Sequence, residues 1–197
     1  EDDLKFAADN LPYPRDTEYG KFSRGLANML LIRLYLHETP EDQSYYNKVE
    51  TIAREMMTAD YGHAMVDDYP SLFELAGQSK CTSEYIYVVP CAIDGPSQHQ
   101  WHMMAMPPDI DGLVQGWATV QSTWYFYDSF EPNATRKTYL IPEYTTGDGV
   151  IRNRENPDQY LDLGPLPQKY EVDPAVPGSG GYSDLDIVVY RYPDVLL

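Results

Sequence analysis

The 197 residues are enough for one compact domain with a sizeable core, and 43% of them are hydrophobic. Aromatic residues make up 13% of the chain, and their number includes 18 tyrosines, so this is not the composition of a disordered protein. The formal net charge of −17 repels phosphate backbones and anionic lipid headgroups. We therefore expect no nucleic acid partner.

The sequence contains no membrane-spanning segment of the usual kind. No stretch approaches the ~20 consecutive apolar residues that a helical span needs, and the acidic first residues (EDDLKFAADN) differ from a signal sequence. We expect the chain as given to be soluble. Because it begins without a methionine and ends within an apolar run at Asp194-Val-Leu-Leu197, we also expect it to be a piece of a longer protein.

Two amphipathic helices are predicted near the start of the chain. Apolar residues recur at steps of three and four over residues 20–37, and again over residues 46–59. The short break between them contains Thr39 and Pro40. Two helices joined by a short loop form an antiparallel hairpin, in which each apolar stripe covers the other. One such pair resembles a single helical repeat unit, without a second copy in this sequence.

The remainder is predicted to be mostly irregular, with a few short elements. Strands are indicated at residues 85–89 and 139–141, and a short helix at residues 121–130. Near the end, an apolar run at 187–190 leads into the start of a helix at 191–197.

The two cysteines flank the first predicted strand. Extended chain advances ~3.3 Å per residue, so the strand between Cys81 and Cys91 holds them far apart. A disulfide tolerates at most about 7 Å between Cα atoms. We therefore expect no disulfide between these two residues.

Sequence motifs for catalysis or metal binding are weak. Nucleophile elbows, phosphate-binding glycine loops and zinc-protease motifs are missing from the sequence. His99 and His102 flank Trp101, but a metal needs further ligands, so exposed loop histidines are the preferred interpretation. Asp109-Ile-Asp111-Gly112 begins like a calcium loop, although its glycine comes too early and no glutamate closes it. We expect no cofactor, with calcium left open.

Aromatic residues of the middle segment give the strongest functional signal. Trp101, Trp117 and Trp124 lie close together in sequence, mostly in irregular chain. A sugar ring stacks its apolar face on an indole, while its hydroxyls need polar side chains around the rim. For Trp124 and Phe126 we prefer a plainer interpretation, in which they plug the core beneath the loop. For Trp101 and Trp117, core packing and exposure to a ligand both stay open.

Several short motifs also follow one another in a recognisable order. They are YGKFSRGLANMLLIRLYL from Tyr19, MVDDYPSLF from Met65, SEYIYVVP from Ser83, the pair Gly116-Trp117, YDSF from Tyr127 with Arg136, and VYRYPDVLL from Val189. Together these motifs resemble the central to C-terminal part of the SusD-like (RagB/SusD) family of outer-membrane glycan-binding lipoproteins. The sequence departs from the family pattern where Asn133-Ala-Thr replaces an acidic residue before Arg136, and it lacks the lipid-bearing cysteine.

The resemblance implies a mainly α fold with irregular loops and a few short strands. Residues 1–197 would be one fragment of a SusD-like domain. Within it, the family implies a tetratricopeptide-like helical hairpin at 19–60, a loop-rich binding lobe at 61–190 and the start of a truncated helix at 191–197. It also implies a place at the outer membrane, on the cell surface of a Gram-negative bacterium, through an N-terminal lipid anchor absent from this chain. The implied partner is a SusC-like TonB-dependent transporter that takes up nutrients.

These observations predict a non-catalytic protein that binds an oligosaccharide or polysaccharide. The candidate site residues are Trp117 and Trp101 for stacking, Tyr87 in support, and Gln115 or Asn133 for the sugar hydroxyls. The alternative is a protein–protein interaction scaffold of the tetratricopeptide type, which docks on a transporter barrel without binding sugar. A glycoside hydrolase is the least supported class, because an acidic surface explains the many carboxylates more simply than a catalytic pair does.

Overall fold

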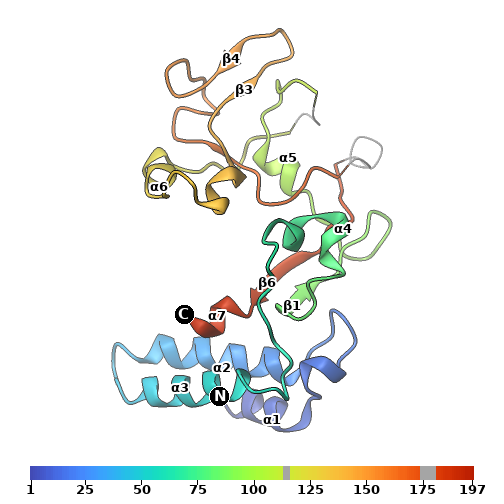
Figure 1. Cartoon of the computed structure of the whole chain (residues 1–197), viewed down its shortest axis with the longest axis vertical. Helices are drawn as coiled ribbons and strands as arrows, with labels where there is room; N and C mark the ends of the chain where they lie inside the picture. Colours follow the sequence, from blue (N-terminus) through green and yellow to red (C-terminus); the bar gives the residue numbers. More distant parts are fainter. Residues whose placement is uncertain (113–115, 174–180) are drawn as a thin grey trace. The chain divides into compact units, whose positions relative to one another are not determined.

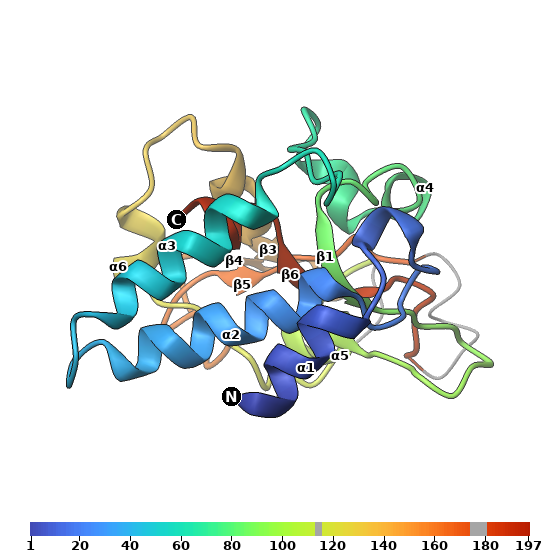
Figure 2. The same cartoon turned by 90° about the horizontal axis from the view of Figure 1, so that it is seen from below.

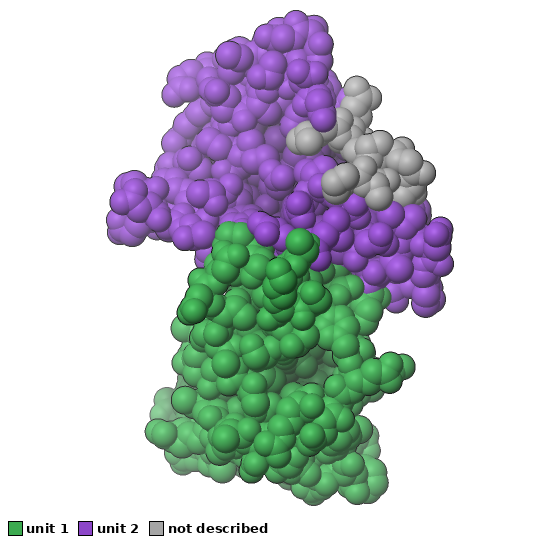
Figure 3. Space-filling model, turned by 45° about the vertical axis from the view of Figure 1, so that its right-hand side comes forward, with its two compact units in different colours: residues 1–72, 76–90, 186–197 green, residues 73–75, 91–185 purple. Residues whose placement is uncertain are grey.

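The computed structural model describes residues 1–112, 116–173 and 181–197, and the chain folds into two compact units (Figure 3). Unit 1 is built from both ends of the chain, and unit 2 is built from its middle. Their residues are Glu1–Leu72, Ala76–Pro90 and Asp186–Leu197 for unit 1, and Phe73–Leu75 and Cys91–Leu185 for unit 2.

Neighbouring helices form the base of unit 1. They are α1 (Asp2–Asn10), α2 (Arg24–Glu38) and α3 (Tyr45–Met56), and α2 packs against both of the others (Figure 1, Figure 2). Ser23 begins α2 by accepting a hydrogen bond on its Oγ from the N–H of Leu26, at 3.3 Å. The predicted hairpin is confirmed by α2 and α3. Helix α1 was not expected, and its packing on α2 explains why α2 is buried over more than one stripe.

The core of unit 1 lies between the helices and a small sheet. Strand β1 (Tyr85–Val89) confirms the predicted strand and pairs antiparallel with β6 (Ile187–Arg191). Helix α7 (Pro193–Leu196) follows β6, at the place where a helix start was expected. Buried residues of α2, α3, β1 and α7 form one cluster together with Tyr61 from the segment after α3; its members are Met29, Ile32, Met56, Tyr61, Ile86 and Val195.

A buried ion pair secures the sheet of unit 1. Glu84, directly before β1, is buried and accepts a hydrogen bond from Nη1 of Arg191 at 2.7 Å. Its other carboxylate oxygen accepts the backbone N–H of Val66 at 2.8 Å. Glu84 thereby joins β6 to the segment that follows α3.

The cysteines behave as the sequence predicted. Cys81 and Cys91 are both buried and form no disulfide with one another. The Sγ atom of Cys81 lies 3.1 Å from Oγ of Ser71, within unit 1.

Unit 2 contains short elements joined by long irregular segments, as expected for the middle of the chain. Its short helices are α5 (Trp101–Ala105), α6 (Trp124–Asp128) and the 3₁₀ helix η3 (Thr135–Tyr139). Its paired strands are β2 (Leu140–Ile141) with β5 (Leu166–Pro167), and β3 (Tyr144–Thr145) with β4 (Ile151–Arg152). α6 and β2 confirm the elements predicted at 121–130 and 139–141. Further short helices among the described residues are η1 (Pro14–Asp16), η2 (Pro70–Phe73) and α4 (Leu75–Gln78).

The core of unit 2 is separate from that of unit 1. It is formed by buried side chains of α5 and the segment after it, of the strands and of the loop before β5, namely Ala105, Met106, Ile110, Tyr144, Leu161 and Leu166. Trp101 and Tyr160 pack against this cluster from its edge.

The structure is therefore a mixed, mainly helical fold with a few short two-stranded sheets. The compact units do not follow the segments 19–60 and 61–190, because β1 and most of residues 61–90 pack with the helices in unit 1. Unit 2 is the nearest counterpart of the expected loop-rich lobe. Within the described ranges, no helix has both the length and the apolar character needed to cross a bilayer.

Candidate functional site

Trp117 lies in a loop of unit 2 that is fixed to the end of α5. The N–H of Trp117 donates to the carbonyl of Met103 at 2.5 Å, and the N–H of Ala118 donates to that of Met106 at 3.0 Å. The last carbonyls of a helix have no partner within the helix, so they are available to a neighbouring segment. The loop thereby completes the end of α5, and α5 in turn holds the backbone of Trp117.

Gly116 explains why this loop comes so close to the helix. A Cβ atom at Gly116 would lie only 2.3 Å from the carbonyl oxygen of Met106 and 2.7 Å from that of Met103. Only glycine allows this approach of one backbone to another. Ala118, two residues later, has a φ of 48°, which is uncommon for a residue with a side chain. The close contact between this loop and α5 therefore requires glycine at position 116.

The indole of Trp117 is 52% exposed, so an aromatic face is available to a ligand on a backbone that is already ordered. Such an arrangement lets a ring stack without the cost of ordering a loop. Of the two interpretations left open for this residue, the structure places Trp117 at the surface and not in the core.

Trp101 is the first residue of α5 and is only partly accessible. Its Nε1–H donates to the carbonyl of Pro167 at 3.1 Å, and its ring contacts Tyr170 edge-on at 5.8 Å between centroids. The indole also packs on the core of unit 2. The structure thus brings Trp101 and Trp117 to the same short helix, but packing within unit 2 occupies much of Trp101.

Helix α6 contains Trp124 and Phe126, which we expected from the sequence to lie in the core. Trp124 is half-buried, and its Nε1–H donates to the carbonyl of Leu161 at 3.0 Å, in keeping with a core role. Phe126 is 45% exposed, so the expectation that it plugs the core is wrong. Tyr125, which the sequence did not single out, is 86% exposed. A helix of five residues makes little more than one turn, so it cannot bury several successive aromatic side chains. The run Tyr125-Phe126-Tyr127 was the feature of the sequence that could have indicated exposed rings.

A cation lies beside the aromatic side chains of α6. The guanidinium of Arg154 is 4.8 Å from the centre of the Trp124 ring. It also donates to both carboxylate oxygens of Asp128, at 3.1 and 3.0 Å. This hydrogen bonding raises the pKa of Arg154, so the cation stays charged beside the ring.

The other candidate residues lie in different places. Asn133 is exposed just before η3 in unit 2, and Gln115 lies outside the described residues. Tyr87 belongs to β1 in unit 1, where it lines a pocket. The predicted stacking residues of unit 2 and Tyr87 are therefore parts of separate compact units.

The histidine expectation is corrected by the structure. His99 and His102 are buried, not exposed, because α5 packs the second of them into unit 2. Burial lowers the pKa of His102, so it is neutral at physiological pH. One oxygen of Asp109 lies 3.1 Å from the hydroxyl of Tyr144. In the part of the chain that the structure describes, no group of three or more acidic, histidine or cysteine side chains could hold a metal.

Solved structures share the fold of this chain. Over 99% of its length it matches B. fragilis NanU, with a TM-score of 0.67 and 18% sequence identity, and the match covers 43% of that protein. A SusD superfamily protein from Bacteroides fragilis matches over 98%, with a TM-score of 0.63, 14% identity and 43% of its own length covered. A SusD homolog from Bacteroides thetaiotaomicron matches over 99%, with a TM-score of 0.60, 18% identity and 44% covered.

Comparisons of sequence give a different result from comparisons of structure. No protein-family model matches the chain, and no curated protein matches it either. The structural matches include nearly all of this chain but less than half of each matched protein. The resemblance found in the motifs is thereby confirmed at the level of structure. The chain has the same fold as one part of the matched SusD superfamily structures.

Proposed function

We propose that this chain is the glycan-binding region of a cell-surface uptake protein, and that it binds an oligosaccharide or polysaccharide without cleaving it. The observation that carries the proposal is the exposed indole of Trp117 on a backbone fixed to α5. The fold shared with SusD superfamily proteins supports the same role. Asn133 and Gln115 are proposed as partners for the sugar hydroxyls, and the remaining accessible part of Trp101 as a second stacking surface.

Binding at such a site is expected to be weak and tolerant of sequence in the glycan. One stacked ring contributes about 1 kcal/mol beyond the burial of its area. Several sugar units in contact with the surface would then be needed for useful affinity. The net charge of −17 disfavours acidic polysaccharides and leaves neutral ones unaffected.

The proposal also covers the location of the protein in the cell and its protein partner. A protein of this type would be held at the outer membrane of a Gram-negative bacterium by an N-terminal lipid and would pass its glycan to a SusC-like TonB-dependent transporter. The proposal includes no catalytic step, because the protein only needs to retain the glycan until the transporter takes it.

Native affinity electrophoresis with starch, xylan and galactomannan in the gel tests this function. The unsubstituted chain should be retarded by at least one of these polysaccharides, and Trp117→Ala should abolish the retardation. Phe6→Ala is a matched control, because it removes a 70% exposed aromatic ring from α1 in unit 1. Equal retardation of Trp117→Ala and Phe6→Ala would show that Trp117 is not part of the site. If the chain bound no saccharide on a wider glycan array, the proposed function would be overturned.

A second candidate function is a docking scaffold that binds no sugar. It is favoured by exposed large apolar side chains on the helices of unit 1 or directly after them, namely Phe6, Leu36, Tyr46 and Met57. Exposed apolar surface of this kind is a feature of protein interfaces when it is contiguous. The glycan array separates the two functions, because a scaffold gives no response to any saccharide.

A further inference from the structure

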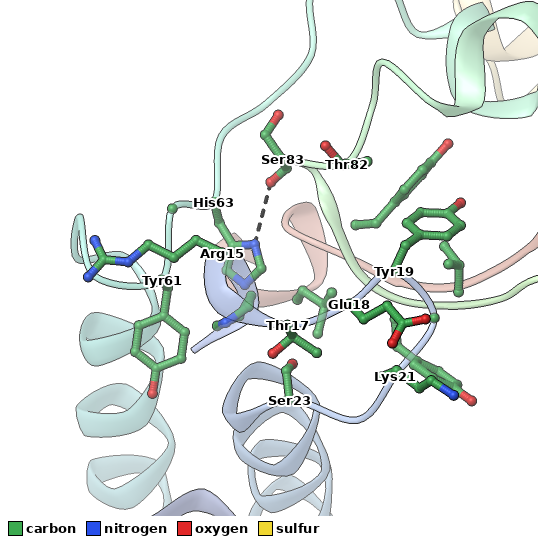
Figure 4. Close-up of a pocket in the computed structure, with 17 residues that line it drawn as sticks. Arg15, Thr17, Glu18, Tyr19, Lys21, Ser23, Tyr61, His63, Thr82 and Ser83 are labelled. Carbon is green, nitrogen blue, oxygen red and sulfur yellow. Dashed lines mark hydrogen bonds between the residues drawn. The ribbon is translucent and has the colours of Figure 1, made fainter. Parts of the chain in front are cut away.

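Unit 1 contains a pocket of about 400 Å³ that the proposed stacking site does not use (Figure 4). Its volume lies in the range of small-molecule sites, which begins at ~300 Å³. One wall is the loop that leads into α2, the opposite wall is the segment after α3, and β1 forms the floor. The lining includes Glu18, Tyr19, Lys21, His63 and Tyr87.

The loop that forms the first wall is held in place before any ligand arrives. The N–H of Lys21 donates to the carbonyl of Glu18 at 3.0 Å, which closes a tight turn around Gly20. Gly20 has a φ of +76°, and a Cβ atom there would lie 2.2 Å from the ring of Pro90. The hydroxyl of Tyr19 donates to Asp186 at 2.6 Å. These contacts fix Glu18 and Lys21 at the two ends of one rigid turn.

The charges of Glu18 and Lys21 are not used elsewhere. Within the described residues, neither side chain forms an ion pair or a hydrogen bond, and both are exposed at the pocket. Arg15, also in the lining, differs because it lies 3.6 Å from Asp16 and 3.5 Å from Asp60. The pocket therefore offers one carboxylate that accepts hydrogen bonds and one ammonium that donates them.

The second wall contributes the imidazole of His63. Nδ1 of His63 lies 3.4 Å from the carbonyl of Ser83, whereas its Nε2 is buried and has no hydrogen-bond partner among the described residues. The ring stacks on Tyr192 at 5.6 Å between centroids, which fixes its plane. Burial lowers the pKa of His63, so the imidazole is neutral and its charge does not select an ion.

Aromatic side chains supply the apolar part of the lining. Tyr87 is half-buried on β1, and its ring lies 5.7 Å from that of Phe22. Tyr61 and Tyr85 also belong to the lining but are buried, so Tyr87 is the tyrosine of β1 that keeps accessible surface there. Flat apolar faces next to separate donors and acceptors match a pyranose ring, whose hydroxyls both donate and accept hydrogen bonds.

We propose that this pocket binds one neutral saccharide unit, as a second glycan site in unit 1 that rests on the glycan-binding function proposed above. The opposite charges of Glu18 and Lys21 disfavour an anion or a cation, since an ion of either sign meets one like charge. A sugar hydroxyl donates to Glu18 while another accepts from Lys21, and Tyr87 lies against the apolar side of the ring. Tyr87, predicted as a supporting residue, thus belongs to this second site.

NMR of the 197-residue chain separates the two sites in one titration. A ¹³C-labelled imidazole of His63 reports on the pocket, and the ¹⁵N-labelled indole of Trp117 reports on unit 2; His63→Gln and Trp117→Phe variants assign the two signals. Glucose, galactose, mannose and N-acetylglucosamine are the probes, with phenylalanine as a zwitterionic comparison. At least one monosaccharide should shift the His63 signal in a saturable way, and phenylalanine should not.

Variants of the rigid turn test the assignment of the pocket. Glu18→Gln and Lys21→Met should each raise the saccharide dissociation constant, measured from the His63 signal, by about tenfold. This is the usual cost of losing a hydrogen bond to a charged group. Glu41→Gln and Lys80→Met are matched controls on exposed residues of unit 1 outside the lining, and they should leave the response unchanged. Both test variants change only exposed side chains, so folding is retained.

The outcomes are distinguishable from those of the main proposal. If saccharides shift Trp117 but leave His63 unmoved, the pocket site is wrong and the stacking site stands. If neither signal moves with any probe or with a longer glycan, the glycan-binding function itself is overturned. A His63 response that is equal in Glu18→Gln and Glu41→Gln, or that appears only with phenylalanine, would also overturn the saccharide site.

Discussion

The hydroxyl of the buried Tyr144 lies 2.5 Å from Oδ2 of Asp158, which is half-buried in unit 2. The same hydroxyl is 3.1 Å from Oδ1 of Asp109. A phenol has one proton, so it donates to one carboxylate at a time, and the shorter distance assigns that proton to Asp158. Tyr144 thereby ties the loop of Asp158 to β3, and the same loop contributes Leu161 to the core of unit 2.

Tyr144→Phe is expected to destabilise the protein by about 1–2 kcal/mol, because it removes the hydrogen bond that the buried hydroxyl donates to Oδ2 of Asp158. Urea unfolding followed by circular dichroism measures the change. Tyr125→Phe is the matched control, since its side chain is 86% exposed and its hydroxyl faces water. Equal unfolding midpoints for the two variants would contradict the role assigned to the Tyr144 hydroxyl.

Alkaline pH is expected to destabilise the protein through tyrosines whose hydroxyl groups are desolvated and hydrogen-bonded to carboxylates. Burial, followed by hydrogen bonding to Asp158, Glu55 and Asp186, raises the pKa of Tyr144, Tyr61 and Tyr19 respectively. Above about pH 10 the unfolded chain releases phenolic protons that the folded chain retains. The folded state then binds more protons than the unfolded state, so the free energy of unfolding falls as the pH rises.

Urea unfolding at about pH 8 and about pH 10.5 measures this effect. The free energy of unfolding should be lower at the higher pH, and the decrease should be smaller in Tyr144→Phe, which has one such group fewer. Stability that is unchanged between the two pH values would show that these phenols titrate normally in the folded protein.

Gly20→Ala is expected to cost at least about 1 kcal/mol more than Gly149→Ala. Both glycines have a positive φ, of +76° and +84°, so the backbone strain of an added Cβ is similar. They differ in their surroundings, because a Cβ at Gly20 meets Pro90 at 2.2 Å whereas nothing lies within 4 Å of one at Gly149. Thermal unfolding of the two variants isolates the packing of the turn against Pro90, and equal losses would show that this close approach is not required.

The sequence predicted those elements whose signal is local. Periodic apolar residues indicated α2 and α3, and a run of strand-forming residues indicated β1. Helix α1 was missed because none of its residues is buried, so it has no clear apolar stripe. The partner of β1 was also missed, since β6 lies near the other end of the chain and only the folded structure brings the two together.

The candidate site depended on contacts that cannot be seen in a single sequence. Trp101 and Trp117 looked alike, yet Trp101 donates to a carbonyl 66 positions away, whereas Trp117 extends from its loop into solvent. Tyr87 was grouped with them by its residue type, but the fold places it in unit 1. Whether an aromatic residue is exposed is decided by long-range packing, and neighbouring residues carry little information about it.

Gly116→Ala tests whether the backbone of the Gly116-Trp117 pair is needed to present the indole. The added Cβ would meet the carbonyl oxygen of Met106 at 2.3 Å, so the loop must move away from α5 and lose its hydrogen bonds to that helix. The variant still contains Trp117, and we expect it to lose most of its retardation in the polysaccharide gel.

Gly147→Ala is the control for this change, because the nearest atom to an added Cβ there is 3.9 Å away. It should bind glycan as the unsubstituted chain does. If Gly116→Ala also binds normally while Trp117→Ala does not, the indole acts without a fixed backbone. The attachment of the loop to α5 would then serve the stability of unit 2, and an ordered platform would no longer explain the affinity.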